Sequence, residues 1–422
     1  MKIVLNFGKD VNEADTAFTL YFTIMACLFT KTYIQLAAQL GIITYVFYSC
    51  LNKKGLRLRI SQTVAQNEFF LLFWLGALTL LAALSGQWAY STKADSNTVL
   101  TLFRMFVIGI NLFLYVNTYN RAVSVLKSLI YSSVVMAVIV LLTTPLSQYG
   151  QAGEEGFGTL IGQQRNTFGA VMAFLIPICV VFEKHENLRY GKWIAAFFAF
   201  SLICSGSRGA MLQMIIIVAL YVLLSPGIKK KIKYISIGTL FCVVMIIIII
   251  NVPFLYAVIW VRFANMFSTV LGMEQIADSS SYGRELYKVL ALQMFWERPW
   301  LGFGVDGFFC RLRDVRYVNG YYLHPVYSHC NFAELAADFG IAGLAIWYIP
   351  VLSVLVKSFR VYNFTPVLKM IFIILTSMIT LDYARIPWSS HSNIYTYFCV
   401  FLLFFFAEEK LILAGSMIEN QH

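Results

Sequence analysis

Long runs of apolar residues recur along almost the whole chain, and short polar connections separate them. A helix needs about 20 residues to cross the roughly 30 Å hydrocarbon core of a membrane. Most of the runs reach or approach this length, so we predict about twelve membrane-spanning helices. Their predicted ranges are 14–31, 33–51, 68–86, 98–116, 126–144, 166–183, 191–205, 209–225, 235–254, 331–352, 367–384 and 392–407.

Composition agrees with this pattern, because 59% of the 422 residues are hydrophobic and only 13% are charged. Soluble domains and disordered chains are both far more polar. We therefore predict an all-α polytopic membrane protein that forms a single integral membrane domain over residues 1–422. Residues 255–330 form the one long polar segment within it.

Basic residues predict how the chain is oriented, since Lys and Arg in short connections stay on the cytoplasmic side of a membrane. One set of alternate connections carries fourteen of them: Lys53, Lys54, Arg57, Arg59, Arg121, Lys184, Arg189, Lys192, Lys229, Lys230, Lys231, Lys233, Lys357 and Arg360. The opposite short connections carry fewer, chiefly Lys31, Lys93, Arg165, Arg208 and Arg385. Both termini are then cytoplasmic, the first apolar run acts as an uncleaved insertion signal, and segment 255–330 is external. This topology accounts for most of the net charge of +11, and we expect no nucleic-acid partner.

Seven of the eight cysteines do not fall into metal-ligand spacing, and we expect neither a metal site nor a cofactor. Cys310 and Cys330 share the predicted external side, and whether they pair stays open. A phosphate-binding P-loop is absent from the sequence, so an enzyme of the external face would need a substrate that arrives already activated.

Two arginines stand where predicted helices begin on the external side. Arg165 opens one such helix within Gly162-Gln-Gln-Arg-Asn-Thr-Phe-Gly169, and a helix N-terminus with an arginine favours an anion. Arg208 lies in the turn Ser205-Gly-Ser-Arg-Gly-Ala210, in which Ser205 and Ser207 add donors suited to phosphate oxygens. The alternative for each is an interfacial arginine that reaches lipid head groups.

The external segment contains a further candidate cation. Ser281-Tyr-Gly-Arg-Glu-Leu-Tyr-Lys288 predicts a surface helix that carries Arg284, and Gly302, Gly304 and Gly307 predict a tight turn that folds the segment back. A solvated ion pair with Glu285 is the alternative role of Arg284. Aromatic residues here suit either the membrane interface or stacking on sugars.

His329 lies where this segment meets the next apolar run. A histidine with a pKa near neutrality can remove a proton from a hydroxyl group, so we interpret His329 as a general base; His324 is a weaker candidate. Asn331, Glu334 and Asp338 follow on one predicted helical face, where they either bind substrate or cap the start of the helix.

These motifs together resemble the bacterial O-antigen polymerase and O-antigen ligase superfamily over roughly residues 160–350. The resemblance rests on Ser205-Gly-Ser-Arg-Gly209, Gly283-Arg284-Glu285, Pro299-Trp-Leu-Gly-Phe-Gly304, His329-Cys-Asn-Phe-Ala-Glu334 and Gly340-Ile-Ala-Gly343. It implies a helical fold akin to the metal-independent, lipid-dependent (GT-C type) glycosyltransferases. One departure is Cys330, where the family commonly has Asn, so the role of that amide passes to Asn331 or is absent.

The resemblance also implies the reaction: transfer of a glycan from undecaprenyl diphosphate to a saccharide hydroxyl on the outer face of the bacterial cytoplasmic membrane. Arg208 and Arg284 would then bind the diphosphate and His329 would deprotonate the acceptor. Further substrate contacts would come from Arg165, Ser205, Ser207, Asn331 and Glu334. A chain-length regulator and a flippase are the protein partners that this implies.

Three functions remain open at this point. We favour a polymerase that joins lipid-linked repeat units, because the Tyr327–Trp347 motif and the Gly-Ser-Arg turn resemble that branch. A ligase that transfers the glycan to lipid A-core is the alternative. A transporter or flippase is less favoured, since its polar groups usually lie at mid-membrane depth, whereas these candidates gather on one side.

Overall fold

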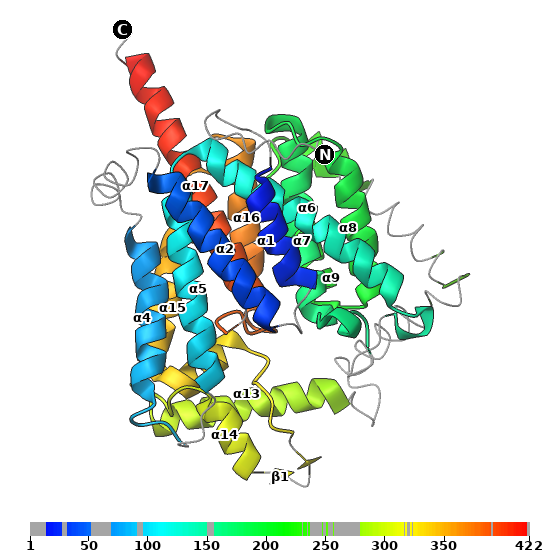
Figure 1. The fold of residues 1–422 in the computed structure, drawn as a ribbon. Helices are drawn as coiled ribbons and strands as arrows, with labels where there is room; N and C mark the ends of the chain where they lie inside the picture. The colour runs from blue at the N-terminus through cyan, green and yellow to red at the C-terminus, as the bar shows by residue number, and fades with distance from the viewer. Residues whose placement is uncertain are drawn as a thin grey trace.

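The computed structural model describes residues 14–27, 32–51, 69–90, 96–149, 156–229, 279–315, 317–318, 321–322, 324–389 and 391–419, with a few positions between 231 and 256. Nearly all of its regular structure is helical, and this confirms the predicted all-α fold (Figure 1). The helices are α1 Thr16–Cys27, α2 Thr32–Leu51, α4 Phe69–Ser85, α5 Ser96–Tyr115, α6 Tyr119–Thr143, α7 Arg165–His185, α8 Gly191–Ser205, α9 Arg208–Leu223, α13 Ser279–Glu297, α14 Gly307–Asp314, α15 Asn331–Val361, α16 Pro366–Leu381 and α17 His391–Glu419.

The remaining elements are short. Two 3-10 turns, η1 Leu146–Gln148 and η2 Thr159–Ile161, precede α7. Strands β1 Tyr317–Val318 and β2 Tyr321–Tyr322 form an antiparallel pair within the segment that was predicted to be external. The same segment contains α13 and α14, so in its described part it is a folded unit.

Several described helices have the properties of membrane spans. Four are long and apolar enough to cross a membrane, namely Asn97–Tyr115, Tyr119–Thr143, Arg165–His185 and Asn331–Val361. Five shorter apolar helices pack with them. Eleven of the twelve predicted ranges coincide with a described helix, and the range 235–254 lies largely outside the described residues. In its described part the protein is therefore a predominantly helical membrane protein.

Three helices extend beyond their predicted apolar ranges. Helix α6 begins at Tyr119 rather than near residue 126, because the Thr118 side chain caps its first turn by accepting a 3.3 Å hydrogen bond from the backbone N–H of Arg121. Helix α15 continues to Val361 and α17 to Glu419, beyond the predicted ends at residues 352 and 407.

The core lies around α17, whose side chains from Ile394 to Ala407 are all buried. Aromatic rings hold α17 against α4 and α15: the ring centroids of Trp74 and Trp347 are 5.0 Å apart, and those of Trp74 and Phe401 are 5.5 Å apart. Such tilted aromatic pairs stabilise beyond their buried area by about 0.5–1.5 kcal/mol each.

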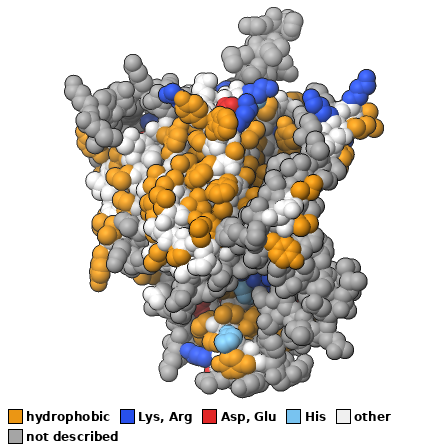
Figure 2. All heavy atoms as spheres, turned by 90° about the vertical axis from the view of Figure 1, so that its right-hand side faces the viewer, with side chains coloured by type: hydrophobic (Ala, Val, Ile, Leu, Met, Phe, Trp, Pro, Cys, Tyr) orange, Lys and Arg blue, Asp and Glu red, His pale blue; other side chains and the backbone are white. Residues whose placement is uncertain are grey.

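The bundle has two chemically different ends. We call the end at which α15 begins the His329 end; helix α13 crosses the bundle there and α14 lies below it, as the lower part of Figure 1 shows. Figure 2 shows hydrophobic side chains over the middle of one face, Lys and Arg along its upper edge, and histidine side chains near the bottom together with a few Lys or Arg side chains. The candidate residues gather at this His329 end.

Candidate functional site

Helices α7 and α9 begin side by side at the His329 end. The hydroxyl of Ser207, the N-cap of α9, donates a 3.0 Å hydrogen bond to Oδ1 of Asn166, the second residue of α7. The first residues of the two helices are Arg165 and Arg208, and each side chain is half-buried. Two helix N-termini, each with an arginine as its first residue, therefore lie in one region, which we call the paired helix starts.

The paired helix starts depend on a close approach of the two backbones. A Cβ atom added to Gly169 of α7 would lie 2.8 Å from the Cβ of Ala210 and 3.0 Å from that of Ser207. Ser205 is fully buried, and its hydroxyl donates to the carbonyl oxygen of Leu202 while accepting from the backbone of Ser207. The two serines that were predicted to contact phosphate thus build the turn that carries Arg208.

His329 lies in a short connection that leads into α15; we call residues 327–330 the His329 loop. His329 has a φ of 59°, a left-handed conformation that non-glycine residues seldom adopt. The backbone N–H of Ser328 donates a 2.5 Å hydrogen bond to Oε2 of Glu334. The Ser328 hydroxyl donates to the carbonyl oxygen of Cys330 and accepts from its backbone N–H. Glu334 therefore holds the loop from the first turn of α15.

The imidazole of His329 lies among aromatic rings and cations. Its ring centroid is 4.4 Å from that of Tyr327 and 6.2 Å from that of Tyr287. Burial, followed by the charges of Arg284 and Lys288, lowers the pKa of His329 to about 4. The neutral form, which can accept a proton, is therefore the dominant form at any pH well above 4.

Lys288 is the site residue that the sequence analysis did not single out. Its ammonium group lies 2.5 Å from a carboxylate oxygen of Glu285 and 3.9 Å from the ring centroid of Tyr383. The signal that identifies it is its spacing, since Lys288 follows Arg284 by four residues and so shares its face of α13. Helix α13 thus presents two cations near His329.

The glycine-rich turn after α13 closes over a kink in α15. Gly340 has a φ of 61° and a ψ of −151°, which interrupts the helix and frees backbone groups on both sides. The turn pairs with them: Ile341 N donates to Pro299 O at 2.7 Å, and Gly304 N donates to Asp338 O at 2.7 Å. This confirms the predicted turn and shows that its motif residues hold the external segment on α15.

The side chain of Asp338 accepts a hydrogen bond from the start of α14. Its Oδ1 accepts a 2.8 Å hydrogen bond from the backbone of Phe308, in the first turn of α14. The carboxylate is fully buried beside the turn that follows α13. Asp338 therefore fixes the start of α14 relative to α15.

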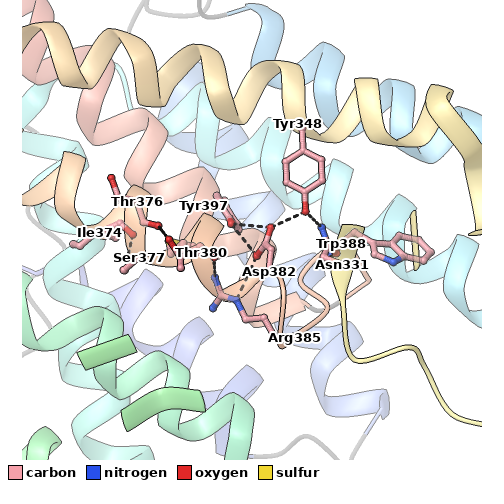
Figure 3. A network of polar contacts seen from close by, with 11 residues as sticks. Asn331, Tyr348, Ile374, Thr376, Ser377, Thr380, Asp382, Arg385, Trp388 and Tyr397 are labelled. Atoms are coloured by element: carbon pink, nitrogen blue, oxygen red, sulfur yellow. Dashed lines mark hydrogen bonds and ion pairs between the residues drawn. The ribbon is translucent and has the colours of Figure 1, made fainter. Parts of the chain in front are cut away.

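Asn331 is the first residue of α15 and joins a buried polar network, which Figure 3 shows. Its backbone N–H donates to the carbonyl oxygen of Asp382 at 2.7 Å, and its Nδ2 donates to the Tyr348 hydroxyl at 2.8 Å. Tyr348 and Tyr397 both donate to the Asp382 carboxylate, at 3.1 Å and 3.3 Å, and Arg385 Nε lies 3.5 Å from it. The network ties the residue two positions after His329 to the α16–α17 connection.

The other candidates lie differently. His324 is exposed, and its ring centroid is 4.8 Å from that of Tyr322. Cys310 and Cys330 are both buried and free, so the structure does not join them by a disulfide. The described residues contain no group of three His, Cys, Asp or Glu side chains placed to hold a metal ion.

Fold and site together define a class: a helical membrane protein in which histidine and arginine side chains gather at one end of the bundle. Comparison with known families is more specific. Residues 193–348 match the family model described as O-antigen ligase. This match confirms the resemblance to the O-antigen polymerase and ligase superfamily, and the matched range contains Arg208, Arg284, Lys288 and His329. No curated protein matches the chain.

Proposed function

We propose that this protein is a surface-polysaccharide polymerase that joins undecaprenyl-diphosphate-linked repeat units on the outer face of the bacterial cytoplasmic membrane. The observation that carries the proposal is the neutral His329 beside Arg284 and Lys288, at the same end as Arg165 and Arg208. A base and a set of cations are what transfer from a diphosphate leaving group requires.

The orientation in this proposal rests on the distribution of charge. Lys184, Arg189, Lys192, Lys357 and Arg360 lie at the end of the bundle opposite His329. Because basic connections stay cytoplasmic, the His329 end faces outward and both termini face inward. We retain about twelve spans and a GT-C-like arrangement as part of the proposal.

The proposed reaction is a single displacement. The neutral imidazole of His329 takes the proton from the acceptor hydroxyl as its oxygen attacks the anomeric carbon. The bond from that carbon to the diphosphate oxygen breaks, and its electron pair leaves with undecaprenyl diphosphate. Arg208 and Arg284 stabilise the charge that develops on this leaving group, with Arg165 as a further contact.

Donor binding would also make His329 more basic. Arg284 and Lys288 help to keep its pKa near 4 in the free protein. A bound diphosphate neutralises part of this positive charge, so the pKa of His329 rises towards its ordinary value. The base would then be strongest when the activated donor is in place.

A ligase is the second candidate, and a specific observation favours it: the matching family model is described as O-antigen ligase. A ligase would use the same donor and the same residues but a lipid A-core acceptor. Deletion of the gene separates the two functions. Single repeat units on the surface glycolipid indicate a lost polymerase, whereas long lipid-linked chains that accumulate indicate a lost ligase.

Transfer by the purified protein in detergent tests the proposal without a sealed compartment. With a lipid-linked repeat unit as substrate, we expect longer lipid-linked products from the wild type. His329→Ala should lower turnover by about 10²–10⁴-fold, the usual contribution of a general base. His324→Ala is the matched control and should keep near-normal activity. Absence of transfer by the wild type would favour a transporter.

A further inference from the structure

Helix α13 exposes a row of large apolar side chains on the face that points away from α15. The exposed fractions are 50% for Val289, 47% for Leu292 and 76% for Trp296, and the row continues after the helix with Trp300 at 73% and Leu301 at 46%. The first three follow one another at spacings of three and four residues, so they share one helical face. We call these five residues the α13 row.

The opposite face of α13 is already occupied. Tyr287, Ala291 and Met294 are buried in a small hydrophobic cluster with Phe308 of α14 and Ala333 of α15. Helix α13 therefore has one covered apolar side and one exposed side, on which the apolar α13 row lies beside the polar Glu285 and Gln293. A helix side of this mixed kind suits the boundary between apolar and polar surroundings.

The place of the α13 row identifies that environment. The carbonyl oxygen of Trp300 accepts a 3.2 Å hydrogen bond from Ala342, and that of Leu301 accepts one of the same length from Trp88 Nε1. The row thus adjoins α15 and the end of α4. Both helices expose apolar residues there, Ile341 at 42% and Leu84 at 45%, as membrane helices do towards lipid.

We propose that the α13 row lies in the interfacial layer of the lipid bilayer and anchors α13 in the plane of the membrane surface. Tryptophan is enriched at membrane interfaces, where its ring contacts both acyl chains and head groups. The row continues the lipid-facing surface of α4 and α15, and Figure 1 shows α13 crossing the bundle where these helices end. The proposal concerns a lipid surface and does not depend on glycosyl transfer.

Fluorescence quenching in vesicles tests this placement. The full chain is reconstituted in phosphatidylcholine vesicles whose acyl chains carry bromine either near the head group or near the chain end. The chain has eight tryptophans, so the difference between the wild type and Trp296→Phe isolates the emission of Trp296. We expect shallow bromines to quench this difference signal at least twice as strongly as deep ones, with little quenching by aqueous iodide.

A tryptophan introduced on α14 provides the water-exposed reference for the quenching measurement at the same end of the bundle. Phe309 is 40% exposed on α14, which Figure 1 shows farther from the membrane helices than α13. In a Trp296→Phe background, Phe309→Trp should respond to iodide and Leu292→Trp to brominated lipid. Quenching of Trp296 by iodide without quenching by lipid would overturn the proposal. Quenching by neither would also overturn it, because the row would then be covered by another protein chain.

Discussion

The paired helix starts and the His329 loop lie at the same end of the bundle but are built in different ways. Arg165 and Arg208 are the first residues of two neighbouring helices, and the Ser207–Asn166 contact joins those helices within their first turns. His329 lies in a left-handed conformation that is held by Glu334 on one side and by Asn331 on the other. In the paired helix starts, two arginines are positioned by the ends of their own helices. In the His329 loop, one imidazole ring is positioned by contacts with residues from other parts of the chain.

This difference predicts how each region responds to change. Charge acts over several ångströms, so the paired helix starts tolerate small movements of the backbone. A general base must lie within hydrogen-bond reach of its proton, so the His329 loop does not tolerate them. Substitutions that shift the backbone should therefore affect the second region more strongly than the first.

The largest effect is expected for Gly340→Ala. The new Cβ would lie 2.5 Å from the carbonyl oxygen of Pro299, at a φ of 61°, and the kink that receives the turn after α13 would be lost. We expect little monodisperse protein by size-exclusion chromatography. Gly209→Ala is the control in the paired helix starts, because its Cβ would meet no atom within 4 Å. Equal loss of folded protein in both variants would contradict the comparison.

A smaller but still large effect is expected for Arg208→Ala, which removes a cation from the paired helix starts. Loss of one preorganised donor to developing charge typically lowers kcat by about 10²–10³-fold. Steady-state kinetics with the purified protein should show this loss. Arg189→Ala, at the opposite end, should leave kcat unchanged. A wild-type kcat in Arg208→Ala would remove this residue from the diphosphate site.

A more moderate effect is expected in the network beneath His329. Tyr348→Phe removes the hydroxyl that joins Asn331 to Asp382, whereas Tyr397→Phe removes a hydroxyl that contacts Asp382 and Arg385 but not Asn331. One lost hydrogen bond is worth about 0.5–1.5 kcal/mol, so Tyr348→Phe should lower kcat about three- to tenfold with little change in KM. If Tyr397→Phe lowers kcat equally, the network acts on stability and does not position His329.

The smallest effect is expected in the pH dependence of kcat and kcat/KM on the acid side. His329 must be neutral to accept a proton, and in the free protein its pKa is lowered to about 4, so kcat/KM should fall only as pH approaches 4. Bound diphosphate raises this pKa, so the acid limb of kcat should lie at higher pH than that of kcat/KM. Lys288→Gln removes one of the lowering charges and should move the limb of kcat/KM upward. Coincident limbs in the wild type would contradict the coupling between donor and base.

The sequence predicted the helical fold and the positions of Arg165 and Arg208 at helix starts, because both depend on local patterns, but it did not predict that the two starts lie side by side. Apolar runs mark the helices, and Arg165 and Arg208 follow turn residues at helix N-termini. The range of α8, 191–205, was predicted correctly for this reason. Burial of Ser205 and Ser207 could not be read from the sequence, because it depends on the close approach of α7 and α9 at Gly169.

The surroundings of His329 were less predictable, since they depend on residues far apart in the chain. Asp382 bonds to Asn331 from another connection, and its neighbours in the sequence give no sign of that partner. Lys288 was recognisable only as a second cation one helical turn after Arg284. The kink at Gly340 has a similar origin, because a glycine within an apolar run does not show that a distant turn pairs with the freed backbone.

The anomeric configuration of the product tests the central claim most directly. The donor is a repeat unit whose linkage to undecaprenyl diphosphate is known, and nuclear magnetic resonance of the joined product reports the configuration of the new linkage. Attack by a hydroxyl that His329 deprotonates, with direct loss of diphosphate to Arg208 and Arg284, predicts inversion at that carbon. Retention would contradict the single displacement and with it the role of His329 as the base.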